Sequence, residues 1–209
     1  MRCVIISDAI IKDYEKVRSC ILQDDFVIFC DGGLCHLEKL GVKPDLIVGD
    51  FDSHEKPSAE KFMDSEIIQL PCEKDDTDTF FAVKEAVKRG FDDFLLVGVI
   101  GQRFDHSLVN ISILMYLFEK GFTAKITDDY SEMEIIGKEP VKISDSYSCF
   151  SLLCIDGNVS GVTIKNAKYP LDNAEITTSY QYGISNEVLP GLTAEASVKN
   201  GKLLLIKNW

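Results

Sequence analysis

The sequence predicts an α/β domain with a mostly parallel sheet and helices on both faces, followed by a small all-β sandwich. Three observations support this. Short apolar runs alternate with helix-like segments over residues 1–128, as parallel βαβ units require. Over residues 129–209 the apolar residues instead occur in short alternating stretches separated by turn residues. No convincing helical pattern occurs in that second part, so we place the domain boundary after residue 128.

Short apolar runs, rich in β-branched residues, predict the strands of the first domain. They cover residues 2–7, 26–30, 46–48, 66–70, 92–97 and 122–127. Segments with apolar residues at helical spacing separate these strands. The predicted helices cover residues 14–22, 34–40, 57–64, 79–89 and 107–120. Glycines at the ends of three of them are typical of helix termination.

Alternating stretches predict the strands of the second domain. They cover residues 132–136, 141–143, 149–155, 162–164, 192–198 and 202–206. The pair Asn200-Gly201 lies between the last two, and Asn-Gly flanked by alternating apolar residues is a strong hairpin signal. We therefore expect the two flanking segments to pair with each other.

The composition limits the possible partners of this 209-residue chain. Lys and Arg total 22 against 34 Asp and Glu, which gives a formal net charge of −12. This balance argues against binding to nucleic acid or to an anionic membrane, because both need a basic face. It permits a phosphate ligand where a metal ion supplies positive charge. There is no secretory signal pattern and no Cys-x-x-Cys pair among the seven cysteines, so we expect reduced thiols and a cytoplasmic location.

Polar clusters directly follow four of the predicted parallel strands. They are Asp31-Gly32-Gly33, Asp50-Phe51-Asp52-Ser53, Lys74 to Asp78, and Gly98 to His106. In an open parallel sheet, ligands bind in the crevice beyond the carboxyl ends of the strands. We therefore expect the four clusters to line one site.

The residue types indicate phosphoryl chemistry at this site. Asp50 and Asp52 would point to the same face of an extended chain, and a hard cation such as Mg²⁺ would relieve their repulsion. Glycines in the clusters let backbone N–H groups approach phosphate oxygens, and Lys74 and Arg103 add positive charge. The pattern predicts a metal-dependent enzyme that transfers a phosphoryl group, without identifying the acceptor.

Each cluster also has a purely structural interpretation. Asp31-Gly32-Gly33 could be a simple turn, and residues 75–78 could cap the helix that follows them. Arg103 could pair with a surface carboxylate, and we interpret His106 as a capping or solvated side chain. His36 and His54 are expected at the surface.

Taken together and in this order, the clusters resemble the motifs of the thiamin pyrophosphokinase family. Lys168-Tyr169-Pro170-Leu171 and Gly183-Ile184-Ser185-Asn186 extend the resemblance over nearly the whole chain. It implies that residues 1–128 form an ATP-binding catalytic domain and that residues 129–209 form a thiamin-binding β-sandwich. The implied reaction transfers pyrophosphate from ATP to the thiamin hydroxyl, giving thiamin diphosphate and AMP. The implied active site is shared between the subunits of a homodimer.

The resemblance also assigns a role to each matching residue. The implied Mg²⁺ ligands are Asp50, Asp52 and Asp78, which act in catalysis together with Arg103 and Asp105. The implied ATP and phosphate contacts are Asp31, Gly32, Gly33, Lys74, Asp75, Thr77, Gly98, Gly101, Arg103 and His106. The implied thiamin contacts are Asp105, Tyr169, Ser185 and Asn186. Tyr169 suits stacking on a flat cationic ligand and equally suits core packing. Gln102 stands where the family's loop often has a second glycine.

Three alternatives remain open from the sequence. Asp50-Phe51-Asp52-Ser53 after a strand is also typical of the aspartyl-phosphate motif of haloacid-dehalogenase-type phosphohydrolases, although two predicted strands precede it here. A related pyrophosphokinase could act on a pterin alcohol instead of thiamin. A non-catalytic sensor could bind the nucleotide or thiamin without releasing AMP.

Overall fold

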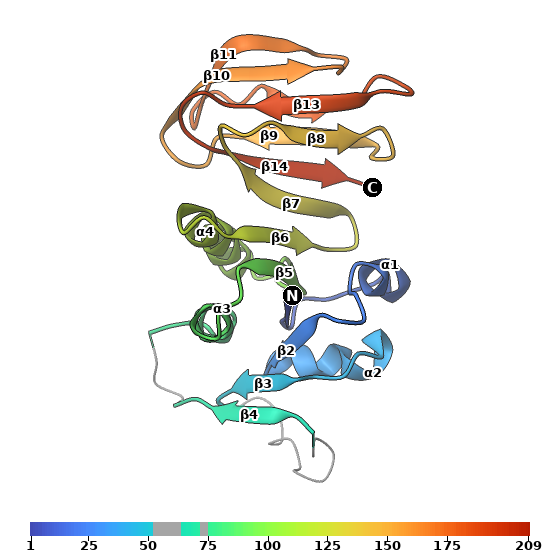
Figure 1. The fold of residues 1–209 in the computed structure, drawn as a ribbon, viewed down its shortest axis with the longest axis vertical. Helices are drawn as coiled ribbons and strands as arrows, with labels where there is room; N and C mark the ends of the chain where they lie inside the picture. The colour runs from blue at the N-terminus through green and yellow to red at the C-terminus, as the bar shows by residue number, and fades with distance from the viewer. Residues whose placement is uncertain (52–63, 72–74) are drawn as a thin grey trace. The chain divides into compact units, whose positions relative to one another are not determined.

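The computed structural model describes residues 1–51, 64–71 and 75–209, which form two compact units, Met1–Asp129 and Tyr130–Trp209 (Figure 1). Residues 57–63 of one predicted helix lie outside the described residues, as do Asp52, Ser53, His54 and Lys74. Within the described part of the chain, no helix has the length and apolar character needed to cross a membrane.

The first unit contains a parallel sheet, as predicted. Its strand order is β6-β5-β1-β2-β3-β4. The strands are β1 (Cys3–Ile6), β2 (Phe26–Cys30), β3 (Leu46–Gly49), β4 (Glu66–Gln69), β5 (Asp93–Val97) and β6 (Thr123–Thr127). The central strand β1 pairs in parallel with β2 on one side and with β5 on the other. The chain winds outward through β2 to β4 and then returns to β5, so the winding direction reverses between β1 and β5.

Helices cover both faces of this sheet (Figure 1). They are α1 (Tyr14–Ser19), α2 (Leu37–Leu40), α3 (Asp78–Lys88) and α4 (Phe104–Glu119), and a 3₁₀ helix η1 (Gly32–His36) precedes α2. Val17 of α1 and Leu40 of α2 pack with Val4 and Phe29 of the sheet. Figure 1 places α3 and α4 on the opposite face. The predicted helix over residues 34–40 is therefore correct in position, but its first part is a 3₁₀ helix.

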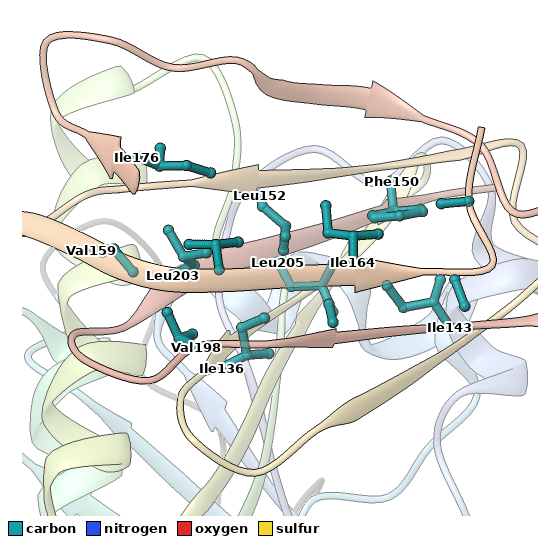
Figure 2. Packing of buried hydrophobic residues seen from close by; sticks show 14 of the residues in the cluster. Ile136, Ile143, Phe150, Leu152, Val159, Ile164, Ile176, Val198, Leu203 and Leu205 are labelled. Atoms are coloured by element: carbon teal, nitrogen blue, oxygen red, sulfur yellow. The ribbon is translucent and has the colours of Figure 1, made fainter. Parts of the chain in front are cut away.

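The second unit is a sandwich of two antiparallel sheets. One sheet has the order β12-β9-β14-β7 and the other β11-β10-β13-β8. The strands are β7 (Ser131–Ile136), β8 (Val141–Ser144), β9 (Cys149–Leu153), β10 (Asn158–Lys165), β11 (Leu171–Thr177), β12 (Gly183–Asn186), β13 (Thr193–Ser197) and β14 (Leu203–Asn208). Figure 2 shows apolar side chains of both sheets, such as Phe150, Leu205 and Ile164, meeting in one core. The predicted fold class is confirmed in both halves of the chain.

The predicted hairpin at Asn200-Gly201 is wrong. Strand β13 pairs with β8 and β10, whereas β14 pairs with β7 and β9 in the other sheet. Asn200 instead exchanges backbone hydrogen bonds of 3.1 Å with Ser160, and Gly201 has a φ of 91°. The turn signal is real, but burial of both apolar faces in a sandwich outweighs local pairing.

Two strands, β11 and β12, were not predicted. In β11, Asn173 has a positive φ of 50° and interrupts the alternation of side chains. In β12, Ser185 has a φ of 54°, and the register with β9 shifts between Gly183 and Asn186. Irregularities of this kind remove the period of two on which strand prediction from sequence depends.

A buried ion cluster lies beside the core of the sandwich. Lys207 on β14 is only 4% exposed and stands directly opposite Glu132 on β7. Its Nζ contacts Glu132 and lies 2.6 Å from Oε1 of Glu134. A buried ammonium group is stable only when it is paired in this way.

We expect Lys207→Met to lower the free energy of unfolding by about 3–5 kcal/mol, because two mostly buried carboxylates lose their shared counter-ion. Urea unfolding of the purified protein measures this change. Adding Glu132→Gln and Glu134→Gln to the same chain removes both charges and should recover much of the loss. A single variant as stable as wild type would show that the cluster contributes little.

Candidate active site

The carboxyl ends of β5, β1, β2 and β3 lie side by side in the first unit. Ser7 follows β1, Asp31 follows β2, Asp50 follows β3 and Gly98 follows β5. The three clusters predicted after β2, β3 and β5 therefore begin at neighbouring strand ends. This edge of the sheet is where a parallel α/β fold holds its ligands.

Asp31 is held between the ends of two strands. Its side chain is 3% exposed, and its Oδ1 atom is buried. A Cβ atom placed on Gly49, the last residue of β3, would overlap the Asp31 Cβ and lie 3.1 Å from the Asp31 Cα. Because glycine has no Cβ, β3 can approach Asp31 closely, and half-buried Asp50 then follows at the same edge.

The geometry between Asp50 and Asp52 differs from the extended chain that we expected. Strand β3 ends at Gly49, and Phe51 has a left-handed φ of 57°. The side chains therefore do not alternate regularly from Asp50 through Phe51. Strand alternation cannot be used to predict that the Asp50 and Asp52 carboxylates point in the same direction. Asp52 itself lies outside the described residues. A non-glycine residue in this conformation costs on the order of 1–3 kcal/mol and is commonest at functional sites.

The N-terminus of α3 reaches the same edge. Thr77 is its N-cap and accepts a hydrogen bond of 3.2 Å from the Phe80 N–H, so the capping interpretation is correct for this residue. Asp78 follows in the first turn with a buried Oδ1 atom. The buried Thr79 hydroxyl donates to Ser7 Oγ at 3.2 Å and ties α3 to the end of β1. Asp75 is exposed.

The electrostatics of Cys30 show that three carboxylates act on the end of β2. Burial raises the pKa of the Cys30 thiol, and the charges of Asp78, Asp8 and Asp31 raise this pKa further. Asp78, Asp8 and Asp31 therefore all lie close enough to the end of β2 to act on the same thiol.

A cavity of about 100 Å³ lies at the ends of β1 and β5. Ser7, Asp8 and Ala9 line one side of it, and residues from Gly98 to Arg103 line the other, together with His106 and Asn110 of α4. Gly98 has a φ of 63°, and a Cβ there would lie 2.5 Å from the Ser7 carbonyl oxygen. Glycine therefore allows the loop after β5 to turn against β1. The predicted residues Gly98, Gly101, Arg103 and His106 all line this cavity.

Arg103 and Asp105 form an exposed ion pair at the start of α4. The guanidinium Nε and Nη2 atoms donate to the two carboxylate oxygens at 3.0 and 2.7 Å. This pairing holds the pKa of Asp105 well below its usual range. Because both side chains are more than 60% exposed, the pair adds little to stability and can rearrange toward a ligand.

Ser7 and Asp8 line the cavity but were not among the predicted site residues. The sequence held a signal for them, since Ser7 is the last residue of the predicted strand over residues 2–7 and Asp8 directly follows it. The same rule that selected the clusters after β2, β3 and β5 applies to them. Neither residue belongs to a glycine-rich or repeated-aspartate pattern, which is why the search for clusters passed over them.

His36 is buried, so its predicted surface position is wrong. It is 3% exposed, with Nε2 3.0 Å from the Ala9 carbonyl oxygen and Nδ1 2.8 Å from the Tyr14 hydroxyl. A carbonyl oxygen only accepts hydrogen bonds, so Nε2 carries the proton and Nδ1 accepts from Tyr14. This neutral histidine fixes the segment that lines the cavity at Ala9.

Burial lowers the pKa of His36 below its usual value of 6.5, although the Ala9 carbonyl opposes this effect. The unfolded chain therefore binds a proton more readily than the folded chain. We expect stability to fall as the pH drops through about 6.5 toward the lower folded pKa. Thermal unfolding between pH 7 and 5 should show a smaller decrease for His36→Gln than for wild type. Parallel decreases in the two proteins would contradict the assignment.

The three predicted thiamin contacts of the second unit lie close together. Tyr169 is 58% exposed, so it is not a core residue. Asn186 is 3% exposed; its side chain accepts from the Tyr169 N–H at 3.0 Å and donates to the Tyr169 carbonyl at 2.8 Å. Exposed Ser185 has the positive φ of 54°, and its N–H donates to Ser151 Oγ at 3.0 Å. Asn186 therefore positions the backbone of Tyr169, while Tyr169 and Ser185 present exposed side chains.

Comparison with known proteins agrees with this architecture. The family description "Thiamin pyrophosphokinase, catalytic domain" matches residues 17–126, and "Thiamin pyrophosphokinase, vitamin B1 binding domain" matches residues 138–203. A thiamine pyrophosphokinase of Bacillus subtilis is 27% identical over 183 residues, which is 85% of each chain.

Solved structures share the fold. The crystal structure of thiamine pyrophosphokinase from Bacillus subtilis superposes with a TM-score of 0.87 at 24% identity, covering 100% of this chain and 99% of that one. The yeast thiamin pyrophosphokinase structure has a TM-score of 0.75 at 16% identity, covering 100% of this chain and 86% of that one.

A parallel sheet with carboxylates and a glycine-containing loop at its carboxyl edge suits an enzyme that transfers phosphoryl groups from a nucleotide. The two regions that match family descriptions identify which family within this class of enzymes the chain falls in. The chain belongs to the thiamin pyrophosphokinase family, and its activity is that of a thiamine diphosphokinase.

Proposed function

We propose that the chain transfers the terminal pyrophosphate of ATP to the hydroxyl of thiamin at the carboxyl edge of the β1–β5 sheet. The observation that carries this proposal is the convergence of Asp31, Asp50, Asp78 and the Gly98–Arg103 loop on neighbouring strand ends. In the proposed reaction the oxygen of the thiamin hydroxyl bonds to the β-phosphorus, and the hydroxyl proton is released. The bond from that phosphorus to the oxygen shared with the α-phosphorus breaks, and AMP leaves with the electron pair.

We propose Mg²⁺ as the metal, with Asp50, Asp52 and Asp78 as its protein ligands. The donors that the structure describes are carboxylate oxygens, which suit this hard cation. Among the described residues, no group of three or more His, Cys, Asp or Glu side chains is already arranged to hold an ion. Asp52 lies outside the described residues, and in the proposal water and substrate phosphates would complete the coordination. When bound, the ion would neutralise charge on the phosphates.

The other residues of this edge bind and orient the nucleotide in the proposal. Arg103 and His106, together with the backbone of the loop that begins at Gly98, contact the phosphates from the cavity side. Asp31, with Gly32 and Gly33 at the start of η1, contacts the phosphates from the other side in this proposal. Lys74, Asp75 and Thr77 complete the contacts ahead of α3, on the basis of the sequence resemblance. Arg103 and Asp105 separate from each other as Arg103 turns to phosphate and Asp105 to thiamin.

We also propose that thiamin is held by Tyr169, Ser185 and Asn186 of a second copy of the chain, so that the active species is a homodimer. The exposure of the Tyr169 ring supports stacking on the thiazolium or pyrimidine ring. The free thiols of the six described cysteines are compatible with a cytoplasmic location.

If the site is shared, two inactive variants should complement each other. We expect Asp78→Asn and Tyr169→Ala to be inactive as separate homodimers. Mixed dimers, formed by co-expression with two affinity tags, should regain part of the wild-type activity, because one of their sites is intact. Mixed dimers as inactive as both parents, or a fully active monomer in sedimentation experiments, would contradict a shared site.

Chromatography of an incubation with ATP, MgCl₂ and thiamin tests the reaction. The proposal expects equal amounts of AMP and thiamin diphosphate, and no product when hydroxymethyl-dihydropterin replaces thiamin. Release of inorganic phosphate with a phosphorylated Asp50 would favour the phosphohydrolase. Binding of ATP and thiamin without AMP release would favour a sensor.

A further inference from the structure

The cavity between β1 and β5 contains a carboxylate that no assigned role explains. Asp8 follows the end of β1 and lies before residue 17, where the match to the catalytic domain of the family begins. Its side chain is exposed and lines the cavity opposite the Gly98–Arg103 loop. This cavity lies where the winding of the sheet reverses, which is the preferred position for a nucleotide in doubly wound folds.

The backbone around Asp8 is fixed on both sides. The Ser7 N–H donates to the Val97 carbonyl at 2.9 Å, and the Ala9 N–H donates to the Gly98 carbonyl at 2.8 Å. The Ala9 carbonyl in turn contacts His36 Nε2 at 3.0 Å. An exposed side chain between two such anchors is preorganised for a ligand, because binding need not order the loop.

One oxygen of Asp8 is already engaged by the protein. Ser7 Oγ donates to Asp8 Oδ1 at 3.3 Å, while Thr79 Oγ1 donates to Ser7 Oγ at 3.2 Å. This chain of hydroxyl groups sets the direction of the carboxylate. Among the described residues, the hydrogen-bond donor to Asp8 is Ser7, so the carboxylate keeps accepting capacity. Its Oδ2 atom lies 3.5 Å from the position that a Cβ on Gly32 would take, so the side chain also packs against the start of η1.

The charges around the cavity indicate which part of ATP the Asp8 carboxylate can contact. Arg103, the guanidinium that lines the cavity, is paired with Asp105. Asp8 would repel the phosphates, but it can accept hydrogen bonds from neutral hydroxyl groups. The ribose of ATP offers two adjacent hydroxyl groups, and acidic side chains accept hydrogen bonds from ribose hydroxyls in dinucleotide-binding folds.

We propose that Asp8 is a specificity-determining residue that accepts hydrogen bonds from the ribose hydroxyls of ATP. This inference rests on the proposed function. The cavity at β1 and β5 then holds the AMP half of the nucleotide, which is the leaving group. The strand ends at Asp31 and Asp50 then hold the pyrophosphate that is transferred. The bond that breaks lies between these two halves.

Nucleotide selectivity tests the assignment. Wild type should use ATP with a kcat/KM roughly tenfold or more above that for 2′-deoxy-ATP or 3′-deoxy-ATP, since a hydrogen bond to a charged group contributes on the order of tenfold or more. Asp8→Ala should lower kcat/KM for ATP and use the three nucleotides about equally. Asp24→Ala, which removes an exposed carboxylate outside the cavity, should keep the wild-type preference.

Calorimetric binding of AMP and 2′-deoxy-AMP separates this inference from the proposed reaction, because it needs no turnover. Loss of AMP selectivity in Asp8→Ala supports the ribose contact even if wild type forms no thiamin diphosphate. An active Asp8→Ala enzyme that keeps the wild-type nucleotide preference overturns the inference and leaves the reaction intact. A raised KM for thiamin alone, or a changed Mg²⁺ dependence alone, likewise overturns it.

Discussion

Asp78→Asn should reduce AMP formation on the order of 10²–10³-fold or more while leaving the fold intact. Removing a group that acts on the charge of a phosphoryl transition state costs at least this much in comparable sites. Asp78 stands in the first turn of α3, with its Oδ1 atom buried at the edge where Asp31 and Asp50 also lie. Asparagine preserves the shape of the side chain but removes the charge that would hold a cation. The loss should therefore fall on catalysis and not on folding.

Steady-state assays of AMP release measure this loss, and circular dichroism checks the fold. Asp76→Asn is the matched control, since Asp76 lies two residues away and pairs with Lys84 on the exposed side of α3. The control should keep activity close to wild type. Turnover of Asp78→Asn close to wild type would remove Asp78 from the site. Equal losses in the two variants would mean that general disturbance of the start of α3 explains the effect.

Gly49→Ala should damage both stability and activity, because its new Cβ atom would overlap Asp31 at the end of β2. Overpacking of this kind costs about 1–3 kcal/mol. The strain falls between two strands whose next residues are both proposed site carboxylates, so β2 and β3 must separate or Asp31 must turn. We expect the activity to fall by at least an order of magnitude, since small displacements of positioned groups have such effects.

Urea unfolding and AMP release should be measured on the same preparations. Asp31→Gly removes the side chain that the new methyl group meets, so the double variant should recover part of the stability lost by Gly49→Ala. Activity should stay low in the double variant, because it lacks the Asp31 carboxylate. A Gly49→Ala protein with wild-type stability and activity would mean that the strand ends are more adaptable than their close approach indicates.

The sequence predicted the fold well wherever the periodic pattern was uninterrupted. The strands of the first unit could be predicted from short apolar runs, and the positions of α3 and α4 from helical spacing. The predictions failed where backbone conformation departs from the regular period. Phe51 and Ser185 have positive φ values that their residue types do not predict, and Asn173 has one that asparagine permits but does not require. The strands that pair with β14 are determined by burial of apolar side chains across the whole sandwich. The turn residues Asn200-Gly201 carry no information about that burial.

The site could be predicted only as far as chain order allowed. Clusters that follow strands must share an edge in a parallel sheet, so the common position of Asp31, Asp50 and Gly98 at that edge could be predicted, while their roles stay a prediction. Asp8 was not predicted because it belongs to no glycine-rich or repeated-aspartate cluster. The burial of His36 was not predicted because it depends on how η1 packs against α1 and the segment at Ala9. His36 in particular is one histidine in a short irregular segment, and its burial against Tyr14 and Ala9 follows from tertiary contacts alone.

The central claim is that this chain moves an intact pyrophosphate group from ATP to thiamin. Incubation of wild type with [γ-³²P]ATP, MgCl₂ and thiamin tests it most directly, with chromatographic separation of all products. The label should enter thiamin diphosphate in amounts equal to the AMP released, with no ADP formed. Accumulation of ADP or labelled inorganic phosphate, with unlabelled thiamin, would contradict it.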